Sequence, residues 1–400
     1  MTAGPALTAL APRSVLRRHR THVTGRPPDL PRRHVPRVPT LGPRQSGALH
    51  RLERTMPFSH GYPVATDIDY RRFGRFLNHM INNCGDPWHD PIYPGHAMDA
   101  ERDVLAWTAD LLHAPPGWHG HMTNGGSEVN LDALWQARTK LPNAIVYTST
   151  AAHYSVRKAC DLLGLPVVPV ATDRYGEMDY ASLRALAGRH RARPAIVVAT
   201  CGTTFTEACD KVPRVHDALD EAGIGHRWIH VDGALALIPR ALTGDGGWFD
   251  LTVANSACFS FHKFLGVPMP AALVISRSSP HRPGPAISYI GVPDTTISGS
   301  RPGLAALMAC YAIDRYGHDG HRHRTELARD LADYTSQQLT GIGWPTWRNP
   351  GAFTVLLRPP PRHVTARWAL PVDGDWARLI CMPGKTRRHI NTLITALKQT

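Results

Sequence analysis

The sequence predicts an α/β fold with a mostly parallel central sheet covered by helices on both faces, followed by a small C-terminal α+β domain. The chain has 400 residues and 42% hydrophobic content, which is enough to bury a large core. Between residues 143 and 274, short β-rich runs alternate with amphipathic segments. This alternation is typical of parallel strands joined by helices. After Arg301 the pattern changes, which indicates a second, smaller domain.

Residues 1–55 are predicted to be a disordered leader rich in arginine and proline. They contain eleven arginines, no lysine and only two acids, Asp29 and Glu53, so they hold much of the net charge of +13. They show no helical or strand periodicity and too little apolar surface to offset the entropy of ordering. Three interpretations remain open: a basic arm that touches nucleic acid or membrane, a targeting peptide, or sequence without function. Ordered-looking sequence begins at Met56, so we expect translation to start there.

Residues 56–112 are predicted to form an N-terminal helical arm. Apolar residues recur at helical spacing, a Gly-Asp-Pro break follows at 85–87, and a second helix is expected near residues 100–112. The residues at helical spacing are Phe73, Phe76, Leu77 and Met80.

Residues 113–303 are predicted to form the larger domain and residues 304–400 the smaller one. In the larger domain we expect strands at 144–148, 167–171, 195–200, 228–231, 251–254 and 272–275, and helices at 156–163, 180–186 and 212–222. In the smaller domain we expect a long helix to about residue 339, strands at 352–357 and 377–382, and a closing helix from Thr386.

Composition excludes several classes of protein. No stretch approaches eighteen uninterrupted apolar residues, so we expect no membrane span and a soluble protein. The seven cysteines are odd in number and include no C-x-x-C pair, which argues against a disulfide framework and fits a reducing cytoplasm. The histidine pairs His119/His121 and His321/His323 lack an acidic or thiol partner that would complete a ligand set, so no metal site is expected.

The first candidate site is the run Thr123-Asn124-Gly125-Gly126-Ser127-Glu128, which precedes an amphipathic helix. Glycines and a serine at a helix N-terminus favour an anion such as phosphate, because backbone N–H groups and the positive end of the helix dipole point at it. Gly125, Gly126 and Ser127 are therefore candidate phosphate ligands. The alternative is a Gly-Gly-Ser turn that only caps the helix.

The second candidate is Asp232, which directly follows the apolar run Trp228–Val231. Ligand-binding groups in α/β folds lie at the carboxyl ends of strands. An ionised carboxylate at this position could hold a pyridine nitrogen protonated and make a pyridine ring an electron sink. The alternative is an aspartate that caps a turn or a helix.

The third candidate is Lys263, which lies just after a short strand among Phe261, Phe264 and Leu265. Lysines are rarely buried without a partner, and a desolvated lysine has a lowered pKa and becomes a nucleophile suited to condensing with an aldehyde. A surface lysine with a buried stem is the alternative. His153 is the fourth candidate, because it follows a strand, opens a helix and could stack on a flat ring. Taken alone, it would be interpreted as a histidine that caps the helix or lies in the core.

These features, in this order, resemble the group II pyridoxal-phosphate (PLP) dependent amino-acid decarboxylases, and more closely the branch of histidine and serine decarboxylases. The resemblance runs from about Gly61 to the end of the chain. It is carried by Gly61–Val64, Asn82–Pro87, Thr123–Asn130, His153–Val156, Gly202–Thr204, His230–Leu235, His262-Lys263, Thr296–Arg301 and Cys381–Gly384. It implies the aspartate-aminotransferase type I fold and a homodimer whose active sites lie at the subunit interface.

The resemblance also implies roles for individual residues. Lys263 would carry the cofactor as a Schiff base, Asp232 would pair with the pyridine nitrogen, and His153 would stack on the ring and face the substrate carboxylate. Ala234 would pack beneath the ring and Thr203 would lie near its phenolic oxygen. Further phosphate ligands would be Ser260 and His262. Phe261 departs from the small residue that often precedes the His-Lys pair, which bears on the substrate rather than on the cofactor.

Three further residues are candidates for substrate chemistry by the same resemblance. Tyr93 and His96 lie in a stretch that reaches the site in relatives, although either could be only structural. Tyr289 follows the Pro/Gly-rich stretch 280–285, in a region that reaches the neighbouring subunit's site. There it would reprotonate the α-carbon, or alternatively pack at the dimer interface.

We therefore expect a PLP-dependent decarboxylase that acts on a small-molecule amino acid, most similar to histidine decarboxylases. Serine or a small aliphatic amino acid of the valine type is an alternative substrate. Two rival functions stay open: another PLP reaction, such as transamination or oxidative deamination, and a basic protein that binds nucleic acid through residues 1–55. The mild basicity of the remaining chain argues against nucleic acid as a partner.

Overall fold

The computed structural model describes residues 41–244, 248–279 and 284–400. The chain divides into two units, residues 1–52 and 53–400, which are considered separately. The helix α1 (Pro43–Thr55) buries none of its residues. The prediction that the leader lacks secondary structure is therefore wrong for residues 43–55. This segment has a proline only at its first position, where a helix tolerates it. Residues 1–40 lie outside the described residues.

The larger part of the second unit is built on a seven-stranded sheet with the order β2-β8-β7-β6-β5-β3-β4. Strands β3 to β7 run parallel to one another, whereas β8 pairs antiparallel with both β7 and β2. The expected mostly parallel sheet is confirmed. The strands are β2 (His119–Thr123), β3 (Ile145–Ser149), β4 (Val167–Val170), β5 (Ala195–Thr200), β6 (Arg227–Asp232), β7 (Ser256–Ser260) and β8 (Ala272–Ser276).

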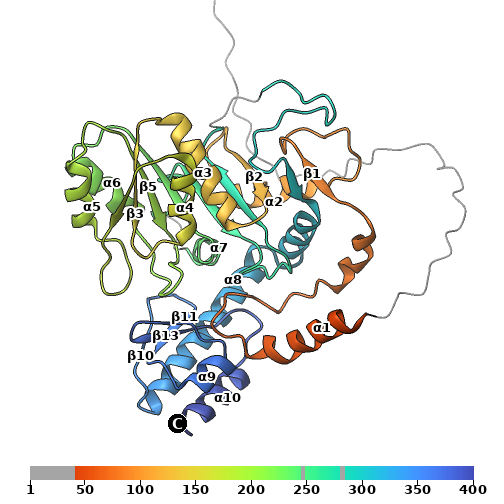
Figure 1. Ribbon diagram of the computed structural model, residues 1–400, viewed down its shortest axis with the longest axis vertical. Helices are drawn as coiled ribbons and strands as arrows, with labels where there is room; N and C mark the ends of the chain where they lie inside the picture. Colours follow the sequence, from red (N-terminus) through yellow and green to blue (C-terminus); the bar gives the residue numbers. More distant parts are fainter. Residues whose placement is uncertain (1–40, 245–247, 280–283) are drawn as a thin grey trace, which may run out of the picture. The chain divides into compact units, whose positions relative to one another are not determined.

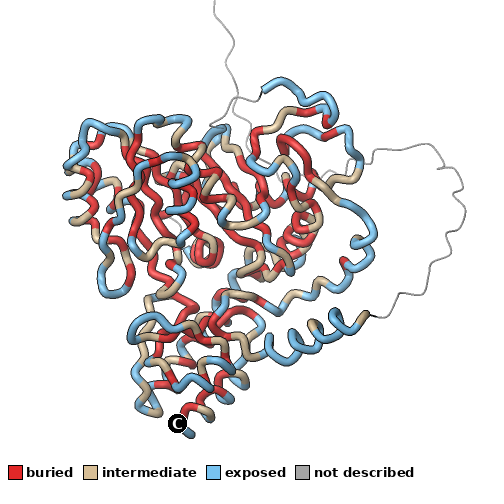
Figure 2. The backbone as a smooth tube through the Cα atoms, viewed as in Figure 1, coloured by how far each residue is buried: buried red, intermediate tan, exposed pale blue. Residues whose placement is uncertain are grey.

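Helices cover both faces of this sheet, and the strand residues alternate between two apolar clusters. Ile196 and Val198 of β5 face a cluster that includes residues of α3 and α4, whereas Val197 and Ala199 face the main core. The sheet is consequently buried over most of its length (Figures 1 and 2). The helices are α2 (Met98–Leu111), α3 (Gly126–Lys140), α4 (Tyr154–Leu163), α5 (Tyr180–Gly188), α6 (Val212–Glu221) and α7 (Leu237–Leu242).

The C-terminal part is a four-stranded antiparallel sheet with the order β10-β11-β13-β12. Its core includes Leu331 of the long helix α8 (Gly303–Gly341), Val355, Leu379 and Ile390. Figure 1 shows α8 running from the larger domain into this smaller one. The remaining elements are β10 (Thr346–Trp347), β11 (Thr354–Leu357), α9 (Arg362–Arg367), β12 (Val372–Asp373), β13 (Trp376–Ile380) and α10 (Arg387–Leu397).

The two domains meet within α8 rather than at residue 304, where the sequence suggested a boundary. Ala305, Ala309 and Ile313 pack in the core of the larger domain, whereas Leu331 and Leu339 pack in the smaller one. Between them Gly317 has φ 57° and ψ −168°, which interrupts the helix. A glycine adopts this conformation without the steric penalty that a side chain would bring.

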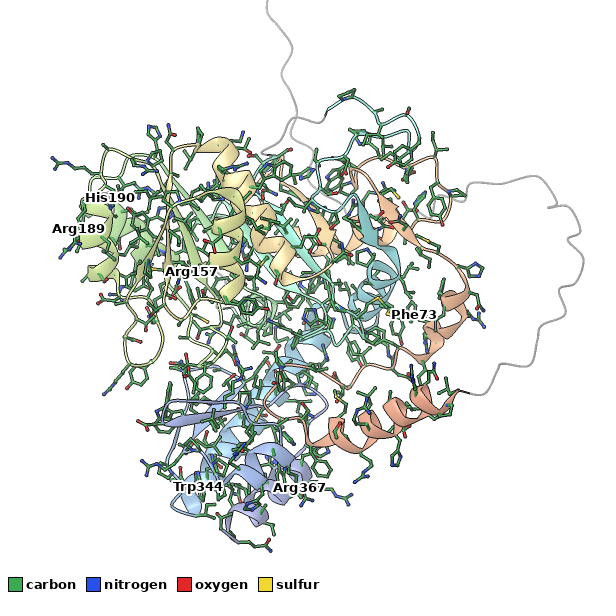
Figure 3. All side chains as sticks on the ribbon, viewed as in Figure 1. Phe73, Arg157, Arg189, His190, Trp344 and Arg367 are labelled. Carbon is green, nitrogen blue, oxygen red and sulfur yellow. The ribbon has the colours of Figure 1, made fainter. Side chains whose placement is uncertain are left out.

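The expected helical arm at 56–112 is only partly right. Its second helix is α2, but the first region contains two short 3-10 helices, Met56–Phe58 and Arg71–Asn78, and the strand β1 (Asn82–Cys84), which pairs with β9 (Ser300–Pro302). Phe73, which is labelled in Figure 3, is 7% exposed, whereas Leu77 and Met80 are 71% and 73% exposed. A helix of this length needs an apolar face against a core, and the pairing with β9 redirects the chain.

The strand expected at 251–254 is also wrong. The Asp250 carboxylate accepts hydrogen bonds from the backbone N–H and the hydroxyl of Thr252, at 2.9 and 2.5 Å, which closes a local turn. Such side-chain bonds compete with a strand ladder. Conversely, β2 was not expected, because its sequence His-Gly-His-Met-Thr contains no apolar run.

Candidate active site

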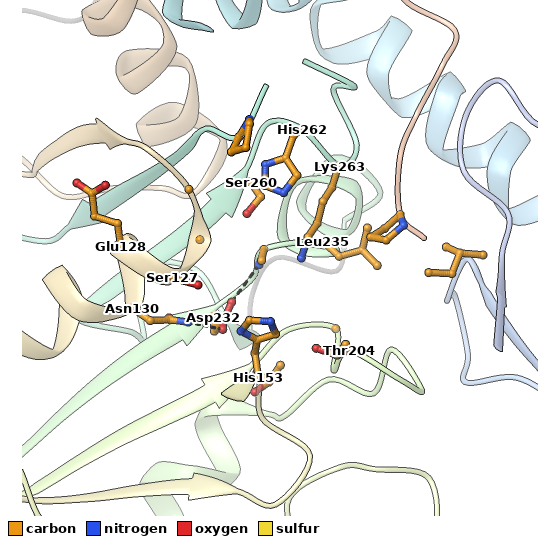
Figure 4. A pocket seen from close by; sticks show the side chains of 18 of the residues that line it. Ser127, Glu128, Asn130, His153, Thr204, Asp232, Leu235, Ser260, His262 and Lys263 are labelled. Carbon is orange, nitrogen blue, oxygen red and sulfur yellow. Dashed lines mark hydrogen bonds between the residues drawn. The ribbon is translucent and has the colours of Figure 1, made fainter. Parts of the chain in front are cut away.

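A cavity of about 550 Å³ opens where the carboxyl ends of β5, β6 and β7 meet the loop before α3 (Figure 4). Parallel strands bring residues that are distant in sequence to one edge of the sheet, which is where α/β folds bind ligands. Nine of the predicted site residues line this cavity: Gly125, Gly126, Ser127, His153, Asp232, Ala234, Ser260, His262 and Lys263.

One end of the cavity suits an anion. Gly125 has φ 148°, which favours glycine, and Gly126 and Ser127, the first two residues of α3, line this end. The N–H groups of the first residues of a helix have no partner within the helix and suit an anion. A side chain at Gly126 would place its Cβ 3.1 Å from the hydroxyl oxygen of Ser260. His262 is held by Nδ1, which lies 3.2 Å from the carbonyl oxygen of Ala271. The glycines thus keep open a cradle of backbone and hydroxyl donors.

Asp232 ends β6 and is only 4% exposed. One carboxylate oxygen accepts from the amide Nδ2 of Asn130 at 2.9 Å, and the other accepts from the backbone N–H of Ala234 at 3.3 Å. Burial alone would raise the pKa of Asp232, but the Asn130 hydrogen bond and the charge of Lys263 oppose burial, and the pKa is lowered. The site therefore holds a buried, ionised carboxylate.

Lys263 follows β7, and its side chain points into the cavity toward Asp232 (Figure 4). Burial lowers the pKa of its amine, although the negative charge of Asp232 works in the opposite direction. The backbone of this turn is fixed at three successive carbonyl groups. The Lys263 carbonyl accepts from the Ala65 N–H at 3.0 Å. The Phe264 carbonyl accepts from Arg324 Nη2 at 3.0 Å, and the Leu265 carbonyl accepts from the Tyr70 hydroxyl at 2.7 Å.

His153 caps the N-terminus of α4 with its side chain. Its Nδ1 lies 2.7 Å from the Ser155 hydroxyl oxygen and 3.3 Å from the Ser155 backbone nitrogen. Burial lowers the pKa of His153. The imidazole is therefore neutral at physiological pH, and it lies beside Asp232 in the same cavity (Figure 4).

Four predicted residues lie away from the cavity lining. The Thr203 hydroxyl contacts the Thr206 hydroxyl at 2.9 Å, and Thr200, Gly202 and Thr204 line the cavity instead. The Tyr93 hydroxyl donates to the carbonyl of Met80 at 2.7 Å. His96 Nδ1 accepts from the Met98 N–H at 3.4 Å. Tyr289 is 81% exposed.

Two residues that sequence reasoning left without a role also line the cavity. Asn130 is one helical turn beyond Gly126 on α3, so it faces the same side. Arg378 comes from β13 of the smaller domain and donates to the carbonyl oxygens of Gly61 and Thr204. An arginine within the apolar run Trp376–Ile380 was a signal that could have been noticed, because buried arginines need partners.

The described part of the chain was searched for metal sites and for helices that could span a membrane. Among residues 41–244, 248–279 and 284–400, no group of three or more His, Cys, Asp or Glu side chains is arranged to hold a metal ion. In the same residues, no helix combines the length and apolar character that crossing a membrane requires.

The groups in this cavity fit pyridoxal phosphate. The anion cradle suits its phosphate, the ionised carboxylate of Asp232 suits its pyridine nitrogen, and the Lys263 amine of lowered pKa suits its aldehyde. Fold and site together define a PLP-dependent enzyme. The chain belongs to the pyridoxal-dependent decarboxylase family, because residues 72–339 match the pyridoxal-dependent decarboxylase conserved domain. It is thus a PLP-dependent amino-acid decarboxylase, as the sequence motifs predicted.

Individual relatives support this assignment. The chain is 37% identical over 365 residues to a histidine decarboxylase from Mesorhizobium japonicum, covering 89% of this chain and 98% of that protein. It is 33% identical to serine decarboxylase 3 from Oryza sativa subsp. japonica, covering 89% and 81%. A crystal structure of L-methionine decarboxylase from Streptomyces sp.590 is similar with a TM-score of 0.80 and 26% identity, covering 89% of this chain and 94% of that one.

Proposed function

We propose that the protein converts L-histidine, or an amino acid of similar size, to its amine and carbon dioxide. The observation that carries the chemistry is that Lys263, Asp232 and the anion cradle share one cavity. The substrate is proposed from the relative named histidine decarboxylase, which is matched over 98% of its length. Serine is the second candidate, because the serine decarboxylase from rice is 33% identical.

The residues divide into cofactor-binding and reacting groups. Pyridoxal phosphate, when bound, supplies the sink for the electron pair released as the carboxylate leaves the α-carbon. The Lys263 amine would anchor it covalently, since its lowered pKa makes it a nucleophile. Asp232 would hold a proton on the pyridine nitrogen. The phosphate ligands would be Gly125, Gly126, Ser127, Ser260 and His262.

The substrate carboxylate would lie between Arg378 and His153. Arg378 supplies a cation from the smaller domain, and His153 supplies a polar ring nitrogen from the other wall. At this cavity the smaller domain contacts the larger one through the Arg378 bond to the carbonyl of Thr204. These contacts would orient the α-carbon and exclude water from it.

We also propose a homodimer whose contact surface includes Tyr93 and Tyr289. The two segments that carry them are joined, because the Ile92 N–H donates to the carbonyl of Ile290 at 2.9 Å. Large apolar side chains are exposed here, including Ile92 at 70% and Tyr289 at 81%. Such a surface is typical of an interface. Tyr289 would reach the partner's site and return a proton to the α-carbon.

The substrate is tested by incubating the purified protein and pyridoxal phosphate separately with each of the twenty L-amino acids, followed by mass spectrometry of the amines. Histamine and carbon dioxide should form without added keto acid or oxygen, and Lys263→Ala protein should form neither. Ethanolamine as the main product would move the assignment to serine. A product that forms only when a keto acid or oxygen is added would overturn decarboxylation as the main reaction.

The shared site is tested by mixing Lys263→Ala and Tyr289→Phe proteins under conditions in which subunits exchange. Each variant alone should be slow, because each lacks one group in both sites. Mixed dimers contain one site with both wild-type residues, so about a quarter of wild-type turnover should return. Light scattering should give the mass of two chains. Absence of recovery from exchanged dimers, or a wild-type rate for Tyr289→Phe alone, would exclude this role for Tyr289.

A further inference from the structure

The amide of Asn130 connects the two sides of the active site. It is 3% exposed and extends from α3 between Asp232 and the N-terminus of α4. A single atom, Nδ2, lies 2.9 Å from Asp232 Oδ2 and also 2.9 Å from the hydroxyl oxygen of Ser155. Figure 4 shows the Asn130 side chain directed at Asp232. The Ser155 hydroxyl continues to His153 Nδ1 at 2.7 Å.

The donor and the acceptor of each hydrogen bond in the series Asp232–Asn130–Ser155–His153 follow from the chemistry of the groups. An ionised carboxylate only accepts, so the Asn130 atom that contacts Asp232 must be the NH₂ group. Its second hydrogen then goes to Ser155, whose hydroxyl oxygen accepts it. The hydroxyl hydrogen of Ser155 is left to point at His153 Nδ1, where the Ser155 backbone N–H also points. A nitrogen approached by two donors carries no proton, so the proton of the neutral imidazole lies on Nε2.

The surrounding charges agree with this assignment. His153 faces Asp232, Lys263 and Lys158, and burial is the largest influence that lowers its pKa. Asp232 faces Lys263, His230, His153 and Cys258. Burial lowers the pKa of His230 to about 4 and raises that of Cys258 well above its usual range, so neither adds charge.

The oxygen of the Asn130 amide makes no hydrogen bond within the described residues, so its NH₂ group is the part that this position uses. Asn130 Oδ1 is buried and has no hydrogen-bond partner within the described residues. A buried, unpaired acceptor is destabilising. An apolar residue of similar size would avoid that defect, but it would leave Asp232 without its strongest neutral donor and Ser155 free to turn its hydroxyl elsewhere.

We propose that Asn130 is a positioning residue that sets two protonation states at once, keeping Asp232 ionised and, through Ser155, keeping His153 as the neutral tautomer with its proton on Nε2. The inference rests on the proposed function in that Asp232 and His153 are taken to flank the bound cofactor. A neutral Nε2–H can orient the substrate carboxylate with one hydrogen bond. It lacks the ionic attraction of an imidazolium. That attraction would stabilise the carboxylate before it leaves and so would raise the barrier to its departure.

The test compares Asn130→Leu and Ser155→Ala with two controls. Gln136→Leu removes another buried amide from α3 that is bonded to Asp132 and Ser276 rather than to the cavity. Ser155→Thr keeps the hydroxyl. Thermal unfolding identifies which variants fold. If Asn130→Leu does not fold, Ser155→Ala carries the test, because it breaks the same chain beyond the asparagine.

The main measurement is ¹⁵N NMR of the full chain labelled at histidine, with and without pyridoxal phosphate, using His153→Gln to assign the His153 signals. Wild type, Gln136→Leu and Ser155→Thr should show the proton on Nε2 at pH 7. Asn130→Leu and Ser155→Ala should show a larger share of the tautomer with its proton on Nδ1 and a shifted titration of His153, because the longer Ser155 backbone N–H bond, at 3.3 Å, is the one donor that these variants leave fixed at Nδ1. The kcat of both should fall by at least about tenfold, with a smaller change in KM.

Folded Asn130→Leu and Ser155→Ala proteins with the wild-type tautomer, titration and kcat would overturn the inference. If kcat falls as far in Gln136→Leu as in Asn130→Leu, the role of Asn130 is structural. Because the NMR measurement needs no turnover, its failure is distinguishable from failure of the proposed function, which would appear as absence of amine from wild-type protein whatever the state of His153.

Discussion

At the scale of single residues, the candidate site keeps one carboxylate charged in a buried position. Asp232 is surrounded by donors: the Asn130 amide, the Ala234 N–H and, at 3.5 Å, the Cys258 thiol. Each of these bonds favours the ionised form, and together with the charge of Lys263 they outweigh the opposing effect of burial. The charge is therefore a property of the neighbourhood rather than of the aspartate alone.

Asp232→Asn should fold and bind pyridoxal phosphate but lose at least about a hundredfold in kcat, roughly 2.7 kcal/mol of transition-state stabilisation. A neutral amide cannot hold a proton on the pyridine nitrogen, and its NH₂ group would compete with that of Asn130. The measurement is kcat at saturating cofactor, with visible absorbance as the control for binding. Turnover within about threefold of wild type would show that Asp232 is not the partner of the ring nitrogen.

At the scale of elements, the loop after β5 is tied to the smaller domain by Glu207. This residue has φ 56°, which is uncommon for a residue other than glycine, and it is 2% exposed. Its carboxylate accepts from the N–H groups of Phe353 and Thr354, at 3.0 and 2.9 Å, and from the Thr354 hydroxyl at 2.6 Å. Gly202 and Thr204 of the same loop line the cavity, so this tie fixes one of its walls.

Glu207→Ala should lower the free energy of unfolding by about 2–4 kcal/mol, because it leaves buried donors on β11 without an acceptor. Denaturation in urea provides the measurement. Glu207→Gln, which keeps one acceptor oxygen, is the matched control and should lose less. An alanine variant as stable as wild type would mean that the backbone donors find other acceptors.

The interruption of α8 is bridged by His321. Its Nε2–H donates to the carbonyl of Ala312 at 3.1 Å across Gly317, while Nδ1 accepts from Arg324 Nη1 at 2.9 Å. Burial, and next the charge of Arg324, lower the pKa of His321 to about 3; the nearby Asp67 raises it and His318 lowers it. The folded protein therefore holds this imidazole neutral well below the pKa of an exposed histidine.

This depressed pKa predicts a stability contribution that is lost in acid. Below about pH 6.5 the unfolded chain binds a proton at His321 that the folded chain does not bind until about pH 3, so stability rises with pH across that window. The unfolding free energy of wild type relative to His321→Gln should fall by up to about 1.4 kcal/mol per pH unit between pH 6 and pH 4. A difference that does not vary with pH in urea denaturation would contradict the assignment.

At the scale of the whole molecule, the family match and the lining of the cavity both lie within the unit of residues 53–400. The family match spans residues 72–339, and every residue that lines the cavity lies between Pro63 and Ile380. Charged residues such as Arg157, Arg189 and Arg367 are exposed and spread over the surface (Figure 3). The helix α1 contributes no buried residue to either core.

A shortened protein that begins at Met56 should keep wild-type kcat and a thermal midpoint within about 2 °C of the full chain, because α1 buries none of its own residues. Differential scanning calorimetry and the amine assay provide the two readouts. Binding of DNA by the full chain but not by the shortened protein would support a nucleic-acid role for residues 1–55. Insolubility of the shortened protein would make that segment structural.

The sequence by itself determined the class of fold, and it located the candidate site residues. Strand β5 lies at the residues expected for it, and Lys263, Asp232 and Gly126 were identifiable because each sits at a strand end or a helix start that local periodicity reveals. Local patterns carry such information since hydrophobic spacing and turn residues act over a few neighbours.

Only the tertiary structure decided which distant side chains share the cavity. The strand order places β6 between β5 and β7, and packing turns Arg378 of the smaller domain and Asn130 of α3 toward the same space. Two predictions were wrong for the same reason: the strand at 251–254, and the helix in which Leu77 and Met80 were to share an apolar face. Backbone pairing and side-chain direction depend on partners far away in sequence, so the hydrogen bonds that set the charge of Asp232 exist only in the folded chain.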